Sequence, residues 1–200
     1  MTAKPIIVVS GLPRSGTSML MQMLAAGGIP VYCDAQRQAD ADNPCGYYEL
    51  TRVKELAKRQ DRAWLDMAQG KAIKIISHLL QRLPGEYVYK TILLKRDLDE
   101  VLASQNQMLA RRGKHTDKNV TAKLRDLFDE HRRHIKNWLG QQNNFEVFEV
   151  EYWRVLNDPA AHAKQLQKFL GIGLQVEKMA AVPDAQLYRQ RQYKTEVKRR

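Results

Sequence analysis

The sequence has few of the features that mark secreted, metal-binding or membrane-spanning proteins. Only two cysteines, Cys33 and Cys45, occur in 200 residues, and neither belongs to a C-x-x-C pair or to a metal-ligand spacing. We therefore expect no disulfide framework and a reduced, cytosolic setting. No apolar run approaches the roughly 18 residues of a membrane-spanning helix, so the protein is expected to be soluble, cytoplasmic and independent of membranes.

Repeats, linkers and low-complexity segments are also lacking. A chain of this length suits one domain with a core of its own, so we expect an α/β domain over residues 1–183 and a basic tail at 184–200 that belongs to it. The net charge is +11, and most of the excess lies in residues 111–118 and 184–200. Two interpretations stay open for these segments, namely solvated surface or contacts with a polyanion such as a nucleic acid.

Strand-like and helix-like stretches alternate along the chain. The spacing of apolar residues predicts strands at about 5–10, 71–76, 87–95 and 145–150, with a shorter one at 29–32, and helices at about 17–27, 50–60, 98–113, 124–139 and 159–170. This alternation predicts a three-layer α/β fold of the P-loop type, with a mainly parallel central sheet flanked by helices. The first strand should be central in the sheet, and residues 145–150 should form a half-exposed edge strand.

Apolar spacing also predicts which faces of two helices are buried. In the helix at 50–60 this face consists of Leu50, Val53, Leu56 and Ala57. In the helix at 124–139, His131 falls on an apolar stripe with Leu127 and Ile135. His131 and His134 form an H-x-x-H pattern, but no third metal ligand is evident, so both are interpreted as structural.

Residues 6–20 join the first strand to the first helix through a loop bounded by Gly11 and Gly16. Such a loop turns backbone N–H groups inward, and the helix start adds unpaired amides and the positive end of its dipole, so the loop can hold a phosphate or a sulfate. The glycine spacing is that of the Walker A loop, G-x-x-x-x-G-K-[ST]. Thr17 occupies the lysine position, and the cation is Arg14, inside the loop.

The absence of the Walker A lysine, at whose position Thr17 stands, argues against phosphoryl transfer. A P-loop kinase or nucleotide hydrolase needs that lysine for the β and γ phosphates, together with an acidic residue at a strand end for Mg²⁺. Here the strand best placed to supply that acid ends in Lys95 and Arg96. Several cations without a metal carboxylate suit transfer of a sulfuryl group, which carries less charge than a phosphoryl group. We therefore expect no metal at the site.

Three motifs in order resemble the P-loop sulfotransferases that use 3′-phosphoadenosine 5′-phosphosulfate (PAPS). Residues 11–18, G-L-P-R-S-G-T-S, are similar to the 5′-phosphosulfate loop of that family. Arg96 and Ser104 keep the family's arginine-to-serine separation, with the arginine at a strand end and the serine in the following helix. Residues 152–159 are similar to the family's Y-E-D-L-x-x-D-P stretch, although Trp153 and Arg154 replace its acidic pair.

The resemblance implies a sulfotransferase that moves a sulfuryl group from PAPS to a hydroxyl or amine of an acceptor and releases adenosine 3′,5′-bisphosphate. It also implies the residues that bind the nucleotide, which are Pro13, Arg14, Ser15, Gly16, Thr17, Ser18, Arg96, Ser104 and Tyr152. Backbone amides of residues 13–18 would hold the 5′-phosphosulfate, Arg14 would stabilise charge on the bridging oxygen, and Arg96 with Ser104 would hold the 3′-phosphate. The family's R-K-G element, a third contact to that phosphate, is not recognisable.

Such a reaction also needs a base that takes the acceptor's proton. The catalytic candidates beside Arg14 are Glu49 and His78, ranked equally, with Asp34 below them. By the resemblance, His78 ends a strand as the histidine of the family's K-T-H motif does, although Lys74 lies four residues before it instead of two. Glu49 ends a stretch, N-P-C-G-Y-Y-E, that is similar to the one before a helix with acidic residues in carbohydrate and bacterial sulfotransferases.

Simpler interpretations stay open. Arg96 could pair with Asp99 or Glu100, Glu49 could only complement a helix dipole, and Tyr152 could be a core aromatic residue. For the whole chain the alternatives are a Mg²⁺-dependent P-loop kinase and a non-enzymatic basic nucleotide or nucleic-acid binding protein. The polar, basic character of the loops at 33–48 and 111–121 favours an anionic or carbohydrate acceptor over a flat apolar phenol. The expected partner is a small-molecule or carbohydrate acceptor, and nucleic acid is the less favoured partner. The sequence indicates no oligomeric state.

Overall fold

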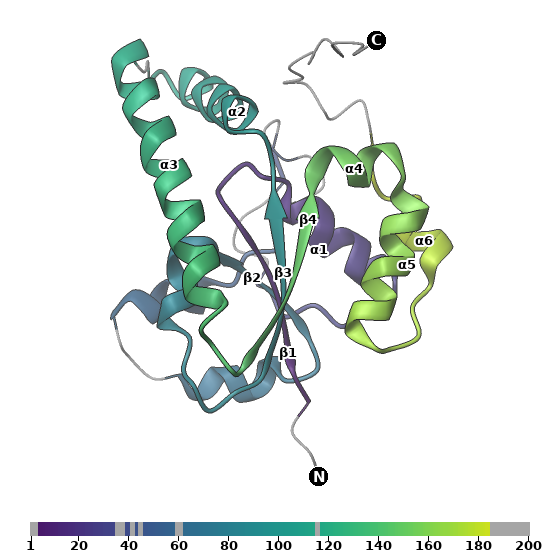
Figure 1. Ribbon diagram of the computed structural model, residues 1–200. Helices are drawn as coiled ribbons and strands as arrows, with labels where there is room; N and C mark the ends of the chain where they lie inside the picture. Colours follow the sequence, from purple (N-terminus) through teal and green to yellow (C-terminus); the bar gives the residue numbers. More distant parts are fainter. Residues whose placement is uncertain are drawn as a thin grey trace, which may run out of the picture.

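The computed structural model describes residues 4–34, 39–40, 43, 46–58, 62–114 and 117–184 (Figure 1). Its parallel sheet consists of β1 (Ile6–Gly11), β2 (Ala72–Ile76), β3 (Tyr89–Lys95) and β4 (Phe145–Glu151), in the order β2-β1-β3-β4. Every residue of β1 is buried, because the strand lies between two neighbours with both faces covered, and this explains its unbroken apolar run. All carboxyl ends of the strands meet at one edge of the sheet, where ligands of such folds bind.

One face of the sheet is covered by four helices that lie together in Figure 1: α1 (Thr17–Ala26), α4 (Tyr152–Asn157), α5 (Pro159–Leu170) and α6 (Val176–Ala180). Their shared core includes Ile7, Val9, Leu20, Met23, Leu166 and Met179. Residues at its two ends determine where α5 begins and ends. The Asp158 carboxylate accepts a 3.0 Å hydrogen bond from the Ala161 N–H, Pro159 opens the first turn, and Gly171 ends the helix with a φ of 71°.

The opposite face is covered by the long helix α3 (Lys118–Leu139) and three 3₁₀ helices, η1 (Thr51–Lys58), η2 (Ala63–Ala68) and η3 (Ser77–Arg82). This second core includes Ile6, Val8, Ile73, Leu80, Ile135 and Leu139. Helix α2 (Leu98–Arg111) leaves the end of β3 after Asp97, whose carboxylate accepts a 2.9 Å hydrogen bond from the Asp99 N–H. No helix within the described ranges has the length and apolar composition to cross a membrane.

The expected three-layer α/β fold with its central first strand is confirmed, and β4 is the predicted edge strand. Several local expectations are wrong. Residues 51–58 form a 3₁₀ helix in which Ala57 is exposed, and Leu127 on α3 is 59% exposed instead of lying on a buried stripe. The short strand expected at 29–32 reduces to one bridge between Val31 and Ala72. Helices α4, α6 and η2 were not predicted, and residues 185–200 of the expected basic tail lie outside the described residues.

Candidate active site

The glycine-bounded loop, residues 11–16, joins β1 to α1 at the carboxyl edge of the sheet. A Cβ atom on Gly11 would lie 2.6 Å from the Ser15 hydroxyl oxygen and 2.7 Å from the Leu94 carbonyl oxygen, so the loop closes tightly there. No side chain caps the first turn of α1, which begins after Gly16. The loop therefore leaves the helix dipole and first-turn amides open to an anion, as the sequence predicts.

The backbone of the loop is bent at Arg14, whose φ of 69° lies in the left-handed region that residues other than glycine rarely adopt. The Ser15 N–H donates a 3.2 Å hydrogen bond to the Leu12 carbonyl within this bend. Pro13 has no N–H at all. Free amides were expected along residues 13–18, but Pro13 and Ser15 shape the turn, and the remaining candidates near the helix start are those of Gly16, Thr17 and Ser18.

Arg14, Arg96 and Ser104 come together from three elements. Arg14 Nε donates a 3.0 Å hydrogen bond to the Ser104 hydroxyl on α2, and Arg96 Nη1, just after β3, donates a 3.1 Å hydrogen bond to the Arg14 carbonyl. Arg96 Nε also pairs with the Glu100 carboxylate at 3.0 Å, where Glu100 is only 4% exposed. The simpler interpretation of Arg96, a pair with Glu100, is thus observed, and the same guanidinium reaches the loop through the Arg14 carbonyl.

Tyr152 packs beneath the same loop. The Arg96 guanidinium carbon lies 4.7 Å from the centre of the Tyr152 ring, an arrangement in which cation–π attraction contributes. A Cβ atom on Gly16 would lie 2.5 Å from two carbons of this ring, and Gly16 has a φ of 99°. The buried ring thus supports the loop and Arg96 from the α4 side, which combines the core interpretation of Tyr152 with a place in the predicted nucleotide site.

Ser18 and Glu49 are linked indirectly on another side of the loop, through the Tyr47 carbonyl and Lys74. The Ser18 hydroxyl accepts a 2.9 Å hydrogen bond from Asn43 Nδ2 and donates one of 3.4 Å to the Tyr47 carbonyl. Lys74 on β2 donates a hydrogen bond to the same carbonyl, and its Nζ atom lies 3.8 Å from the Glu49 carboxylate. Lys74 therefore connects the sheet to the segment that carries Glu49.

The two remaining side chains predicted near this region behave differently from each other. The Asp34 carboxylate accepts a 2.6 Å hydrogen bond from the Thr51 N–H, so it caps the start of η1. The Thr17 hydroxyl, at the start of α1, has no hydrogen-bond partner among the residues that the structure describes. Thr17 thus keeps a donor for a ligand, whereas one oxygen of Asp34 already has a structural partner.

His78 lies in η3, directly after β2, and its charged form would repel that of His131 on α3. Burial lowers the pKa of His78 below its usual value, so its imidazole is neutral at pH 7 and can accept a proton. The pKa of His131 on α3 is lowered as well, first by burial and then by the nearby His78 and His134. His131 Nε2 lies 2.8 Å from the Ser77 hydroxyl, in hydrogen-bonding distance.

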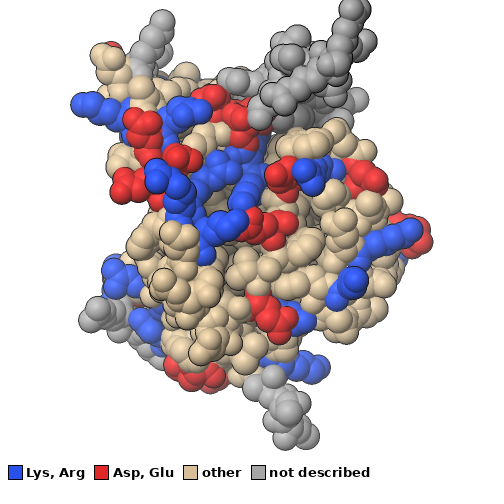
Figure 2. Space-filling view, in the orientation of Figure 1, with Lys and Arg blue, Asp and Glu red and all other residues tan. Residues whose placement is uncertain are grey.

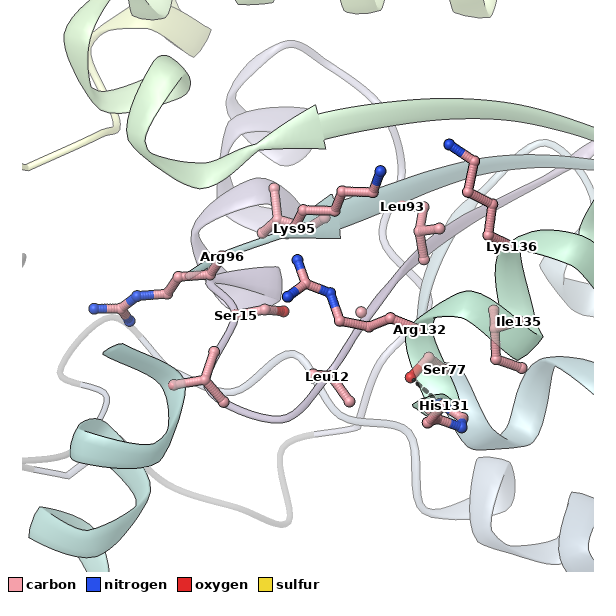
Figure 3. Close-up of a pocket in the computed structure, with 13 residues that line it drawn as sticks. Leu12, Ser15, Ser77, Leu93, Lys95, Arg96, His131, Arg132, Ile135 and Lys136 are labelled. Carbon is pink, nitrogen blue, oxygen red and sulfur yellow. Dashed lines mark hydrogen bonds between the residues drawn. The ribbon is translucent and has the colours of Figure 1, made fainter. Parts of the chain in front are cut away.

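A pocket opens between the loop, the end of β3 and α3 (Figure 3), and its empty space of about 420 Å³ includes open solvent. Its lining includes Leu12 and Ser15 of the loop and His131 of α3. Figure 2 shows Lys and Arg side chains gathered over this region, at the carboxyl end of the sheet between α3 and α4. Across the described residues, no group of three or more His, Cys, Asp or Glu side chains is arranged to hold a metal ion.

The predicted residues thus fall into a joined set and two separate pairs. Arg14, Arg96, Ser104 and Tyr152 are in contact with one another or with the loop, whereas Glu49 pairs with Lys74, and His78 lies by His131. Sequence reasoning named Glu100 as a possible partner of Arg96 but missed the places of Lys74 and His131. The only available signal for His131 was the H-x-x-H pattern, and Lys74 was judged by its spacing to His78 and not by its place beside Glu49.

Comparison with known families agrees with this geometry. Residues 4–194 match the model of the sulfotransferase domain family, so the chain belongs to that family, which makes it a transferase of sulfuryl groups. No curated protein sequence matches the chain significantly.

Solved structures show the same fold. Sulfotransferase STF1 from Mycobacterium tuberculosis H37Rv is 16% identical, with a TM-score of 0.58 over 92% of this chain and 72% of that one. The sulfotransferase domain from the curacin biosynthetic pathway is 16% identical, with a TM-score of 0.51 over 89% and 77%. A sulfotransferase from Alicyclobacillus acidocaldarius is 14% identical, with a TM-score of 0.50 over 92% and 85%.

Proposed function

We propose that the donor of the sulfuryl group is PAPS, that the acceptor is a small molecule or carbohydrate with a hydroxyl or amine, and that the second product is adenosine 3′,5′-bisphosphate. The observation that carries this proposal is the contact of Arg96 and Ser104 with Arg14, because it joins a second set of anion-binding groups to the glycine-bounded loop. A nucleotide with phosphates at both its 5′ and 3′ positions needs two such sets.

The residues present suit this nucleotide. The uncapped start of α1 and the Thr17 hydroxyl would receive the 5′-phosphosulfate, and the tight approach at Gly11 leaves no space for a side chain there. Arg96 and Ser104 would receive the 3′-phosphate, with Tyr152 supporting Arg96 from beneath. When bound, the donor supplies a sulfur that accepts the acceptor's oxygen or nitrogen while its bond to the phosphate oxygen breaks.

Arg14 would stabilise the negative charge that collects on the phosphate oxygen as that bond breaks. The acceptor's proton passes to a base, and two observations favour His78 over Glu49. Partial burial lowers the pKa of His78, so its imidazole is neutral at pH 7, and it lies within electrostatic range of His131, which lines the pocket next to the loop. Glu49 lies 3.8 Å from a lysine, and Asp34 already caps η1.

The donor is tested with the full chain by calorimetry. We expect adenosine 3′,5′-bisphosphate to bind and ATP with Mg²⁺ to bind at least tenfold more weakly. No lysine follows Gly16 to hold the β and γ phosphates, and β3 ends at Lys95, followed by Arg96, instead of at an acidic residue that could hold Mg²⁺. Tight binding of only ATP with Mg²⁺ would contradict PAPS as donor and favour the kinase alternative. Transfer of labelled sulfate from PAPS across a panel of alcohols, amines and sugars then identifies the acceptor class.

A further inference from the structure

The pocket is lined by three cations in addition to Arg96. Arg132 and Lys136 come from α3, and Lys95 comes from the end of β3 (Figure 3). Lys95 and Lys136 share one carboxylate, that of Glu149, with Lys136 Nζ at 3.1 Å. Among the described residues, Glu149 supplies the one carboxylate that pairs with any of these three cations, so the pocket keeps an excess of positive charge.

Arg132 is the cation without a counter-ion. Among the residues that the structure describes, no carboxylate lies within 4.0 Å of its guanidinium, although it is half-buried. Burial lowers its pKa more than the distant carboxylates of Asp129, Asp97 and Glu149 raise it. Removing a guanidinium from water without an ion pair is unfavourable, and the planar group suits the two oxygens of a carboxylate, sulfate or phosphate.

Ser15 supplies a second, independent observation. Its side chain is only 1% exposed, and its hydroxyl has no hydrogen-bond partner among the described residues. Buried hydroxyls nearly always have a partner. Ser15 and Arg132 both line the pocket, where Figure 3 draws their side chains, so an anion bound there has a hydroxyl and a guanidinium donor among the lining residues.

From this geometry we propose that the pocket binds an oxyanion group, a carboxylate, sulfate or phosphate, that is carried by the acceptor, with Arg132 as its principal ligand and the Ser15 hydroxyl as a second donor. This inference rests on the proposed function, and it narrows the acceptor to an anionic molecule. Arg132 would then be a specificity-determining residue, since a neutral acceptor leaves its guanidinium unpaired. The pocket is lined by residues of the glycine-bounded loop and by His131, so an anion held by Arg132 would lie next to the loop that is proposed to hold the sulfuryl group.

The test uses the full chain and two variants of adjacent residues, Arg132→Gln and the control Arg133→Gln. The Arg133 side chain is 71% exposed and pairs with Asp129 on the same helix, so both changes remove one charge from α3, but only one removes it from the pocket. Adenosine 3′,5′-bisphosphate is first bound to saturation, and inorganic phosphate is then titrated by calorimetry. We expect Arg132→Gln to weaken phosphate binding at least tenfold and Arg133→Gln to leave it within twofold.

Kinetics then compare a neutral sugar with its uronic acid counterpart. Arg132→Gln should raise the KM of the charged acceptor about tenfold, which corresponds to about 1.4 kcal/mol, and leave that of the neutral acceptor unchanged. Arg132→Lys should recover part of the loss. Phosphate binding without any effect on acceptor preference would mean a free anion as ligand and would overturn the assignment to the acceptor.

Two further readouts keep the inference separate from the proposed function. If Arg132→Gln, but not the unaltered protein, fails to bind adenosine 3′,5′-bisphosphate, the pocket belongs to the nucleotide and the inference is overturned. If the unaltered protein also fails to bind it, the proposal of PAPS as donor is contradicted instead. Arg132→Gln should also leave the free energy of unfolding unchanged or raise it, because an unpaired, half-buried charge is removed. A marked loss of stability would make Arg132 a structural residue and overturn the inference as well.

Discussion

Arg14 Nε donates a hydrogen bond of 3.0 Å to the Ser104 hydroxyl, although 90 positions separate the two residues in the sequence. The contact joins the glycine-bounded loop after β1 to the helix after β3. Because β1 and β3 are parallel neighbours, their carboxyl ends present the loop and α2 side by side. The cation inside the loop is thus held by the residue that the family resemblance assigns to the 3′-phosphate.

Replacement of Arg14 by Ala should lower kcat for sulfate transfer by about 10²–10³-fold, because the variant loses the charge that stabilises the leaving phosphate oxygen. Binding of adenosine 3′,5′-bisphosphate should weaken far less, since most of its proposed contacts come from other residues. Labelled sulfate transfer measures the first effect and calorimetry the second. Arg133→Ala, on the exposed face of α3, is the control, and unchanged turnover in Arg14→Ala would remove this residue from the chemistry.

Replacement of Glu100 by Gln should lower the free energy of unfolding by about 3–5 kcal/mol, because it leaves the buried Arg96 guanidinium without its carboxylate. Asp99→Asn is the matched control in the same first turn of α2. Asp99 pairs with Arg125 on the surface, so its loss should be below about 1 kcal/mol. Urea titration measures both. Equal losses of free energy of unfolding in the two variants would show that the buried Arg96–Glu100 pair stabilises the fold no more than the surface pair does.

Replacement of Gly16 by Ala should destabilise the protein by about 1–3 kcal/mol, because the new Cβ meets the Tyr152 ring and a positive φ is unfavourable for alanine. Gly85→Ala is the control, since a Cβ there has no atom within 4 Å, and its effect should be below about 0.5 kcal/mol. Urea titration compares them. Gly16→Ala should also weaken binding of adenosine 3′,5′-bisphosphate, and normal stability with normal binding would contradict the tight loop.

The strands could be predicted from the sequence because β1 is a contiguous apolar run, β2 and β3 are mostly apolar, and β4 alternates apolar with acidic residues, so the burial of each follows from its own residues. β1 is the clearest case, with every residue buried between two neighbours. Leu127 shows the limit of the same reasoning for helices. The amphipathic pattern of α3 includes Leu127, but the helix extends past the sheet (Figure 1), and Leu127 stays 59% exposed. Periodicity indicates a face, and tertiary packing decides how much of that face is covered.

The predicted residues that come together in the structure follow strands closely or, like Ser104, were indicated by the family resemblance. Arg14 and Arg96 follow strands, and the meeting of parallel strand ends was enough to place them together. His131 and Arg132 lie in the middle of a helix, and they reach the loop because α3 crosses the face of the sheet. No local pattern indicates which residues of such a helix line a pocket, and the absent ion pair of Arg132 is a property of the folded arrangement alone.

The identity of the base should appear in the pH dependence of kcat/KM. His78 has a pKa lowered below 6.5, and its neutral form accepts the proton, so kcat/KM should be level above about pH 6.5 and fall as the pH drops through the lowered value. His78→Asn should reduce kcat/KM by about 10²–10⁴-fold and abolish this acidic decline. His134→Asn, an exposed histidine on α3, is the control for loss of an imidazole nearby.

Glu49→Gln is the competing variant in the same experiment. If His78 is the base, Glu49→Gln keeps the acidic decline and changes kcat/KM modestly, because its carboxylate serves mainly to hold Lys74. If His78→Asn keeps both its rate and its decline while Glu49→Gln loses both, Glu49 is the base and His78 is not. Circular dichroism at each pH verifies that the protein is folded, since the tested decline must come from protonation of one group and not from acid unfolding.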